Sequence, residues 1–223
     1  MTRERETIRV VDGTVSSLGV GASEVASAVI DGHYTVECWG PIEERRAEYI
    51  ALRDAHAVET HPNAIAWLKR QLDAIPLELK WKDTIENVVT TVGKNNMLDN
   101  HLAGSSYTAA WFMGLISATS YTTGPAAGDT MASHGGWAED TAYAAATRPA
   151  PSFSAASGGS KATSSNVSFS MNATTTIKGC FLNSVSTKGG TTGTLFSAGL
   201  FTGGDQPVVN GNTLNVSYTA TLT

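Results

Sequence analysis

Apolar and polar residues alternate with a period of two in several short stretches of the chain. The alternation is strict at residues 167–171 and 214–219, and it recurs at residues 34–39 and 77–82. Because successive side chains of a β-strand point to opposite faces of the sheet, this period predicts strands with one buried and one solvated face. Further strands are expected where apolar runs lie between turn residues, at 111–117, 174–182 and 194–201.

Turn residues separate these stretches along the second half of the chain. Asn210-Gly211 lies between Val208-Val209 and Thr213-Leu214. Asn-Gly favours the tight turns whose positive φ matches the twist of paired strands, so this segment predicts a β-hairpin. Short strands with turns at this spacing are typical of an antiparallel β-sandwich or jelly-roll. We therefore expect a mainly β fold.

A helical pattern interrupts the strands between residues 41 and 76. Residues 42–59 are rich in Glu, Arg and Ala, and residues 62–75 carry apolar side chains at steps of 3, 4 and 3, which form one helix stripe. The stripe consists of Ile65, Leu68, Leu72 and Ile75. Pro62 suits a first helical turn, and Pro76 ends the helix. The region is predicted to be an αα-hairpin inserted between two strands that a short turn could otherwise join.

A third helix and an extended arm complete the expected organisation. The helix is predicted over about residues 94–102, after Gly93, with Met97, Leu98, His101 and Leu102 on its buried side. The first 28 residues place Gly and Ser between short apolar pieces such as Ile8-Arg9-Val10-Val11, which predicts an arm. We expect the arm at 1–28 and a β-sandwich domain at 29–223, interrupted by the helical insertion at 41–76.

Charge is distributed unevenly along the chain. Residues 1–101 hold 11 of the 15 Lys and Arg and 16 of the 20 Asp and Glu, whereas Ser and Thr occupy 37 of the last 122 positions. The net charge of −5 leaves no basic stripe of the kind that nucleic-acid binding requires. No apolar run approaches the roughly 20 residues of a membrane helix, and the charged start lacks the apolar core of a signal peptide. We expect synthesis in the cytoplasm, with Cys38 and Cys180 as buried thiols in strands.

The histidines do not form a recognisable catalytic or metal-binding pattern. His56 and His61 are five residues apart and point to different faces of a helix, without a nearby third ligand. Ser133, His134 and Asp129 lie in one short loop, and such close neighbours rarely converge on one reacting atom. The loop is interpreted as structural, with its polar groups fixing turns and a tryptophan packing beneath.

Carboxylates give no stronger indication of catalysis. Glu139 and Asp140 are adjacent and are expected to be solvated, whereas glycoside hydrolysis needs two carboxylates facing each other across a cleft. We therefore expect no catalytic residue, no cofactor and no metal site, and we predict that the protein is not an enzyme.

The surface composition favours contact with other proteins. Only 16% of the residues are charged, against roughly 25% in average globular proteins, so few charges have to be desolvated at an interface. Five aromatic side chains within 37 residues are the candidate interface residues: Tyr107, Trp111, Tyr121, Trp137 and Tyr143. The simpler interpretation is that most of them fill the core of the sandwich; the other is that they anchor a subunit interface.

Several segments share a combination of motifs with one protein family. They are TIENVVTTVGKN (84–95), LD (98–99), AGSSY (103–107), WFMGLI (111–116), AGDTMASH (127–134), GW (136–137), TRP (147–149), KGCFL (178–182) and GGD (203–205). Together they resemble a family of virion structural proteins of tailed bacteriophages, over residues 31–40 and 77–223. Relatives join the first strand to the segment after residue 77 by a short turn, so the chain departs from the family at 41–76. The family offers no catalytic residues to transfer.

The resemblance implies a structural role in the virion, and several roles remain open. The first is a capsid decoration, or cement, protein on the outer capsid surface, which bridges major capsid subunits and associates with itself as a dimer or trimer. The alternatives are a tail, adaptor or fibre component, or a carbohydrate- or host-surface-binding β-module in which Tyr121, Trp137 and Tyr143 stack on sugar rings. A hydrolase that uses His134 is the least supported. Direct contact with nucleic acid or a membrane is not expected.

Overall fold

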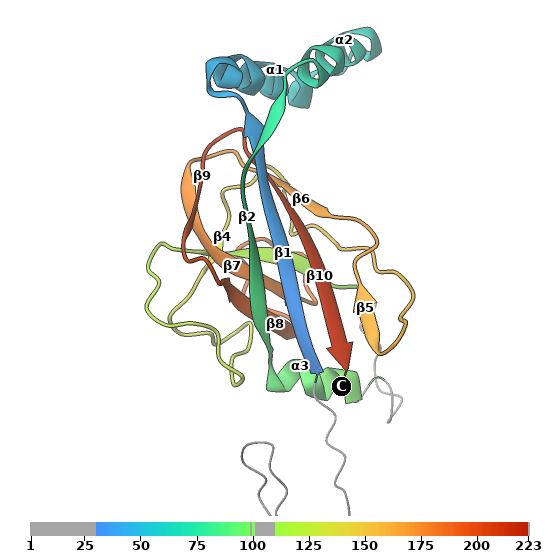
Figure 1. Ribbon diagram of the computed structural model, residues 1–223, viewed down its shortest axis with the longest axis vertical. Helices are drawn as coiled ribbons and strands as arrows, with labels where there is room; N and C mark the ends of the chain where they lie inside the picture. Colours follow the sequence, from blue (N-terminus) through green and yellow to red (C-terminus); the bar gives the residue numbers. More distant parts are fainter. Residues whose placement is uncertain (1–29, 99, 101–109, 223) are drawn as a thin grey trace, which may run out of the picture.

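The computed structural model describes residues 30–98, 100 and 110–222. Over these residues ten strands form one antiparallel sheet, accompanied by three α-helices and one short 3-10 helix (Figure 1). The expected mainly β, antiparallel fold is confirmed. The predicted arm at 1–28 and Tyr107 lie outside the described residues.

Strands occur along the whole described chain, whereas its helices all precede β3. The strands are β1 (Ile30–Pro41), β2 (Leu77–Val89), β3 (Phe112–Ser117), β4 (Glu139–Asp140), β5 (Ser160–Ala162), β6 (Val167–Ser170), β7 (Thr175–Asn183), β8 (Leu195–Phe201), β9 (Gln206–Val208) and β10 (Thr213–Leu222). The helices are η1 (Glu43–Arg45), α1 (Arg46–Val58), α2 (Pro62–Asp73) and α3 (Thr91–Leu98).

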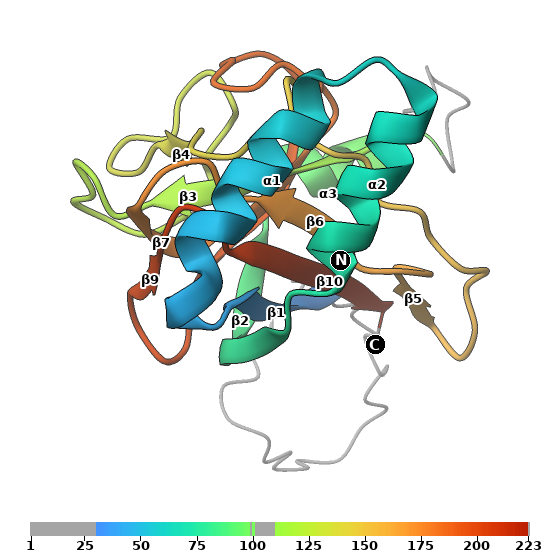
Figure 2. The same cartoon turned by 90° about the horizontal axis from the view of Figure 1, so that it is seen from above.

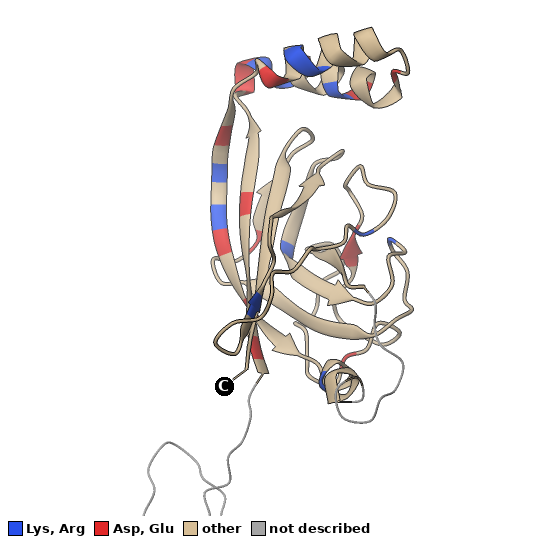
Figure 3. Cartoon of the chain, turned by 90° about the vertical axis from the view of Figure 1, so that its right-hand side faces the viewer, with Lys and Arg blue, Asp and Glu red and all other residues tan. Residues whose placement is uncertain are grey.

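The sheet bends into two layers. Its strand order is β4-β3-β7-β8-β2-β1-β10-β5, and β6 and β9 pair beside this path with β10 and β7. Strands β1, β2 and β10 run along the long axis of the molecule, while β3, β7 and β8 cross behind them (Figure 1). Figure 3 shows the two groups of strands from the side, facing each other. The layers of this sandwich-like arrangement thus belong to one hydrogen-bonded sheet.

The main core lies between the two layers. Strand β1 contributes Tyr34, Val36 and Cys38, all fully buried, and the residues between them are partly solvated, as their alternation predicted. Strands β7 and β8 contain runs of consecutive buried residues, because both of their faces are covered. Their second face packs against a smaller apolar cluster, to which the loop after β3 contributes Met131 and Trp137.

The predicted αα-hairpin is present as α1 and α2. It lies between β1 and β2, whose ladder extends to the pair Pro41 and Leu77, so the helices are inserted where these two paired strands end. On α2, Leu68 of the predicted stripe is buried, and so is Ile75 just beyond the helix. The apolar stripe thus forms the inner side of the hairpin, as its spacing indicated.

The prediction of a β-hairpin at Asn210-Gly211 is wrong. A turn is present there, with Gly211 at a φ of +93° and with the Asn212 N–H donating to the carbonyl of Val209 at 3.0 Å. The strands on either side do not pair with each other, because β9 pairs with β7 and β10 pairs with β1, β5 and β6. The sequence therefore predicts the turn correctly, but not the partners of the strands beside it.

Helix α3 begins earlier than expected. Thr90 precedes it, and its hydroxyl accepts a hydrogen bond from the Gly93 N–H at 3.0 Å, which is the bond of an N-cap. Met97 packs against the main core as predicted, but Leu98 is 56% exposed, which corrects the prediction that it is buried. His101 and Leu102 lie outside the described residues.

Two glycines allow strands β7 and β8 to approach closely. A Cβ atom added to Gly179 would lie 1.9 Å from the carbonyl oxygen of Gly199, which is in the backbone and cannot move aside cheaply. We predict that Gly179→Ala lowers the free energy of unfolding by about 1–3 kcal/mol or more, as overpacking typically does. Chemical denaturation measures this effect. Gly128→Ala, where a Cβ meets nothing within 4 Å, is the matched control and should change stability little.

Candidate interaction surface

The helical hairpin lies across one end of the sheet, and α1 attaches it there. Figures 1 and 2 show α1 and α2 side by side above the ends of β1 and β2. The Arg53 guanidinium donates to the carbonyl of Met171 at 2.9 Å and to the side-chain oxygen of Asn210 at 3.0 Å. Ile50 lies next to Gly211 in the same turn. Helix α2 packs on α1.

Local interactions stabilise the two short helices. Pro62 occupies the first turn of α2, and the Glu59 carboxylate accepts the backbone N–H groups of Thr60 and His61, both at 2.8 Å, in the connection between the helices. These two hydrogen bonds favour the charged form and lower the pKa of Glu59. Lys69 and Asp73 add an ion pair of 2.9 Å, one helical turn apart.

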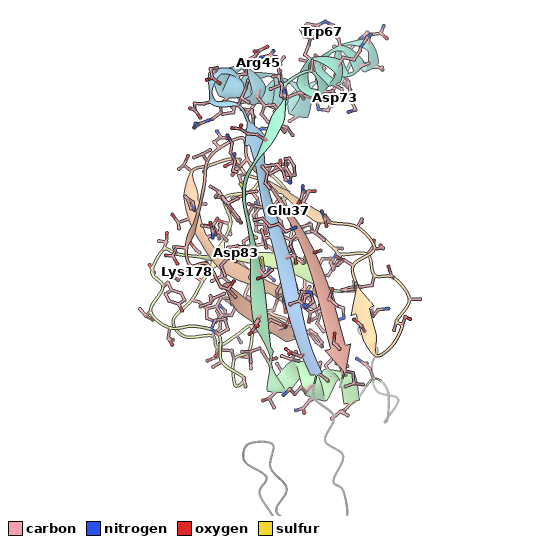
Figure 4. All side chains as sticks on the ribbon, viewed as in Figure 1. Glu37, Arg45, Trp67, Asp73, Asp83 and Lys178 are labelled. Carbon is pink, nitrogen blue, oxygen red and sulfur yellow. The ribbon has the colours of Figure 1, made fainter. Side chains whose placement is uncertain are left out.

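Apolar side chains are exposed on this end of the molecule. Seven large apolar residues of the described chain are exposed, and four of them belong to the hairpin or to the first residues of β2: Val58, Trp67, Leu77 and Leu79. Trp67 is 53% exposed and Val58 is 80% exposed. Figure 4 places Trp67 on the side of α2 that is turned away from the strands. Exposed apolar groups of this size are typical of contact surfaces.

Charged side chains gather on the hairpin and on β2, and the rest of the sheet carries few (Figure 3). Lys82 and Glu37 form a 2.9 Å ion pair between neighbouring strands, and Lys178 pairs with Asp205. The surface formed by the second half of the chain is therefore close to neutral, as its composition indicated.

Glu139 is buried in a bidentate ion pair, so the expectation that the two adjacent carboxylates are solvated is wrong. Its side chain is 4% exposed, and that of its partner Arg148 is fully buried. The guanidinium donates to the two carboxylate oxygens at 3.1 and 2.7 Å. Its remaining donors reach the carbonyls of Val185 at 2.9 Å and Gly190 at 2.7 Å. This pair fastens the loop between β7 and β8 to β4.

Two more donors complete the Glu139 site. The Gly189 N–H donates to the carboxylate at 2.7 Å, and the Tyr143 hydroxyl donates to it at 3.1 Å. Burial and the neighbouring negative charge of Glu139 raise the pKa of Tyr143 far above its usual range. Each carboxylate oxygen has two protein donors, which suits a structural role.

Asp140 is buried on the opposite side of β4. It accepts the hydroxyls of Ser117 at 3.1 Å and Thr175 at 2.7 Å, and the backbone N–H of Ala142 at 2.9 Å. Sequence reasoning missed this burial because the hydroxyl donors are 23 and 35 residues away along the chain.

Polar groups of the loop around His134 fix its turns and Trp137 packs beneath them, as predicted. The Asp129 carboxylate accepts the indole N–H of Trp137 at 3.0 Å and the backbone N–H of Ala126 at 3.0 Å. The His134 ring packs against the Trp137 ring, with centroids 4.2 Å apart, and its Nδ1 lies 3.1 Å from the carbonyl oxygen of Thr130. Asp129 thus orients the tryptophan.

The described part of the chain contains no group of three His, Cys, Asp or Glu side chains placed to hold a metal ion. None of its helices has the length and apolar character that a membrane span requires. Cys38 and Cys180 are free and buried, as predicted, and burial raises the pKa of the Cys38 thiol to about 12.

The candidate aromatic residues do not form one surface. Trp111 is half-buried at the edge of the main core, with its ring 5.1 Å from that of Phe196, and Tyr121 packs against the smaller cluster beside Lys178. The prediction that Trp137 and Tyr143 are interface residues is corrected, because these residues are only 4% and 0% exposed in the fold. The same burial removes two of the three residues proposed to stack on sugar rings.

Trp67 is a surface residue that the sequence patterns did not single out. The helical stripe of α2 identifies the residues that face α1, and Trp67 lies off that stripe. A tryptophan off the apolar stripe of an amphipathic helix is the signal that could have identified it.

Comparison with known proteins finds no family model that matches the chain and no curated protein that is significantly similar to it.

Asp83, labelled in Figure 4, fixes the turn that joins β8 to β9. Its carboxylate accepts the Thr202 hydroxyl at 3.0 Å, the Gly203 N–H at 3.0 Å and the Gln206 amide at 2.9 Å, and it also accepts the backbone N–H of Thr84 at 2.7 Å. Partial burial opposes the charged form, but the hydrogen bonds together outweigh it and lower the pKa of Asp83.

We predict that Asp83 contributes an acid-sensitive part of the stability. Because its pKa is lower in the folded chain, its contribution is complete above the unfolded pKa of about 3.9 and is lost as the pH falls through the folded value. Asp83→Asn should therefore be less stable than the wild type at pH 7, and the difference should shrink towards pH 3. Urea denaturation across this range measures it. Asp73→Asn, which removes only the exposed pair with Lys69, is the control.

Proposed function

We propose that the protein is a structural subunit of a tailed-bacteriophage particle: a decoration protein that attaches to the outer face of the capsid and bridges major capsid subunits. The observation that carries this proposal is the helical hairpin, held at one end of the sheet with large apolar side chains uncovered. The resemblance of the sequence to virion structural proteins of tailed bacteriophages points to the same assignment.

The hairpin has enough uncovered apolar area to contribute measurably to binding. A tryptophan side chain buries about 150–250 Å², so covering the exposed half of Trp67 removes roughly 100 Å² from water. At about 25 cal/mol per Å², this area corresponds to roughly 2.5 kcal/mol for each subunit. Val58 adds to this area. Such a contact is modest by itself, but it is repeated at every copy on a symmetric shell and can be strengthened by multivalent attachment.

The neutral surface of the sheet is also suited to close packing. Most of the few charged groups in the second half of the chain are already paired or buried, as Arg148 is with Glu139 and Lys178 is with Asp205. A protein neighbour therefore has few charges to desolvate when it packs against these strands. This property suits a subunit that sits among copies of itself and of a shell protein.

Copy number separates this role from the tail, adaptor or fibre role. A decoration protein should be present in hundreds of copies in each purified virion, which quantitative mass spectrometry measures. A count of about a dozen or fewer would reject the decoration role, and absence from the particle would reject any virion role.

We predict that Trp67→Ala weakens attachment to capsids by roughly 10- to 100-fold, the range that a loss of about 1.4–2.8 kcal/mol gives. Co-sedimentation of the purified protein with capsids that lack it measures the affinity. Lys69→Ala, an exposed position on a different face of the same helix, is the matched control and should bind like the wild type. The thermal unfolding of Trp67→Ala should stay near that of the wild type, since its side chain is half-exposed. Unchanged binding by this variant would contradict the role of the hairpin.

A further inference from the structure

The turn at Asn210-Gly211 carries a chemistry that the proposed function does not use. It is the one Asn-Gly pair in the chain, and such a pair deamidates spontaneously because glycine leaves the attacking backbone nitrogen unhindered. The Gly211 nitrogen gives up its proton to a base and attacks Cγ of Asn210, and the side-chain nitrogen takes up a proton and leaves as ammonia. Water then opens the resulting succinimide ring to aspartate or isoaspartate, so the only co-reactant is water.

In the folded chain both reacting groups are engaged by other residues. The Gly211 N–H donates to the carbonyl of Met171 at 3.1 Å, so the proton that a base must remove is already used in a hydrogen bond. The side-chain oxygen of Asn210 accepts a hydrogen bond from the Arg53 guanidinium at 3.0 Å. The same guanidinium donates to the carbonyl of Met171 at 2.9 Å. One side chain of α1 therefore contacts both the amide that would be attacked and the group that holds the attacking nitrogen.

Helix α1 also covers the turn. Gly211 is buried, whereas Asn210 is only partly buried. The closest atom of Ile50 lies 3.2 Å from the position that a Cβ would take at Gly211, which places the helix against the glycine. The Arg53 side chain is itself only 19% exposed. A base therefore reaches the Gly211 nitrogen when α1 moves away from the turn.

We propose that Asn210 is a latent deamidation site that α1 protects, so that the succinimide forms in molecules whose helical hairpin has moved away from the sheet. The reaction then makes that opening permanent or reverses it. Hydrolysis to aspartate places a carboxylate where Arg53 already reaches, and an ion pair replaces a neutral acceptor. Hydrolysis to isoaspartate adds a carbon to the backbone of the turn and changes the surface on which α1 packs. The proposal concerns the free protein and does not rest on the virion role.

Deamidation of the purified full-length protein at mildly alkaline pH tests the proposal. Peptide mass spectrometry locates the products at residue 210, and the fraction converted over time gives the rate. We expect the wild type to react about 10-fold or more slowly in buffer than in guanidinium chloride, where no opening of the fold is required. Equal rates in the two solutions would overturn the proposal, and so would an Asn210 that does not react in the denaturant.

The variant Arg53→Ala tests the role of α1. Removing the guanidinium should raise the deamidation rate in buffer by about 10-fold, the scale on which a hydrogen bond to a charged group contributes. Arg70→Ala is the matched control, because this exposed guanidinium donates to the carbonyl of Ala66 within its own helix, and it should react like the wild type. A rate for Arg53→Ala equal to that of the control would overturn the proposal.

Hydrogen exchange separates opening of the hairpin from a chemical effect of Arg53 on the amide. If α1 acts as a cover, Arg53→Ala raises the exchange rate of the Gly211 N–H by about the same factor as the deamidation rate, while the N–H of Val36 in the core of β1 keeps its protection. Faster deamidation without faster exchange at Gly211 would overturn the proposal, because access would then not limit the reaction. Equally faster exchange at Val36 would overturn it as well, because the whole fold and not the hairpin would then be opening.

Discussion

The long ladder between β1 and β2 is the constraint on which the other features of the molecule depend. It runs from the pair of His33 and Glu86 to the pair of Pro41 and Leu77, and β1 pairs over nearly its whole length with β10 on its other side. One end of this ladder holds the helical hairpin, and its middle supplies the inner face of the core. The period of two in β1 sets which residues serve each purpose, since a shift by one residue would turn Tyr34 and Val36 out of the core.

The buried ion pair between Arg148 and Glu139 holds the loop between β7 and β8 against the bent sheet. This loop lies against β4. Two of its carbonyl groups are partly buried there and need hydrogen-bond donors. Arg148 supplies these donors and is itself neutralised by Glu139, so neither charge is left uncompensated. Breaking such a pair is far more costly than replacing both partners with apolar residues, and the pair therefore mainly fixes geometry. A consequence is a sheet surface with few free charges.

The sequence predicted elements that depend on local pattern and missed those that depend on distant partners. The strand around Tyr34 and the αα-hairpin follow from apolar periods that local geometry enforces, and Pro62 and Pro76 mark the second helix. The pairing of β9 with β7 could not be read from Asn210-Gly211, because a turn constrains its own backbone but not the partners of the strands that flank it. The burial of Glu139 likewise depends on the Gly189 N–H, 50 residues away. Trp67 was within reach of sequence reasoning, since it is a large apolar residue off the predicted stripe of an amphipathic helix.

The hairpin follows one end of β1, and an apolar groove lined by Ile30 lies at the other end. The two surfaces share no residue, and the rigid double ladder of β2, β1 and β10 separates them. A contact made through Trp67 therefore leaves the opposite end of these strands uncovered. The sheet between them has an almost neutral surface on which neighbours can pack at little cost in desolvation. A contact at the hairpin and a contact along the sheet therefore use different surfaces, so the chain has room for two neighbours at once.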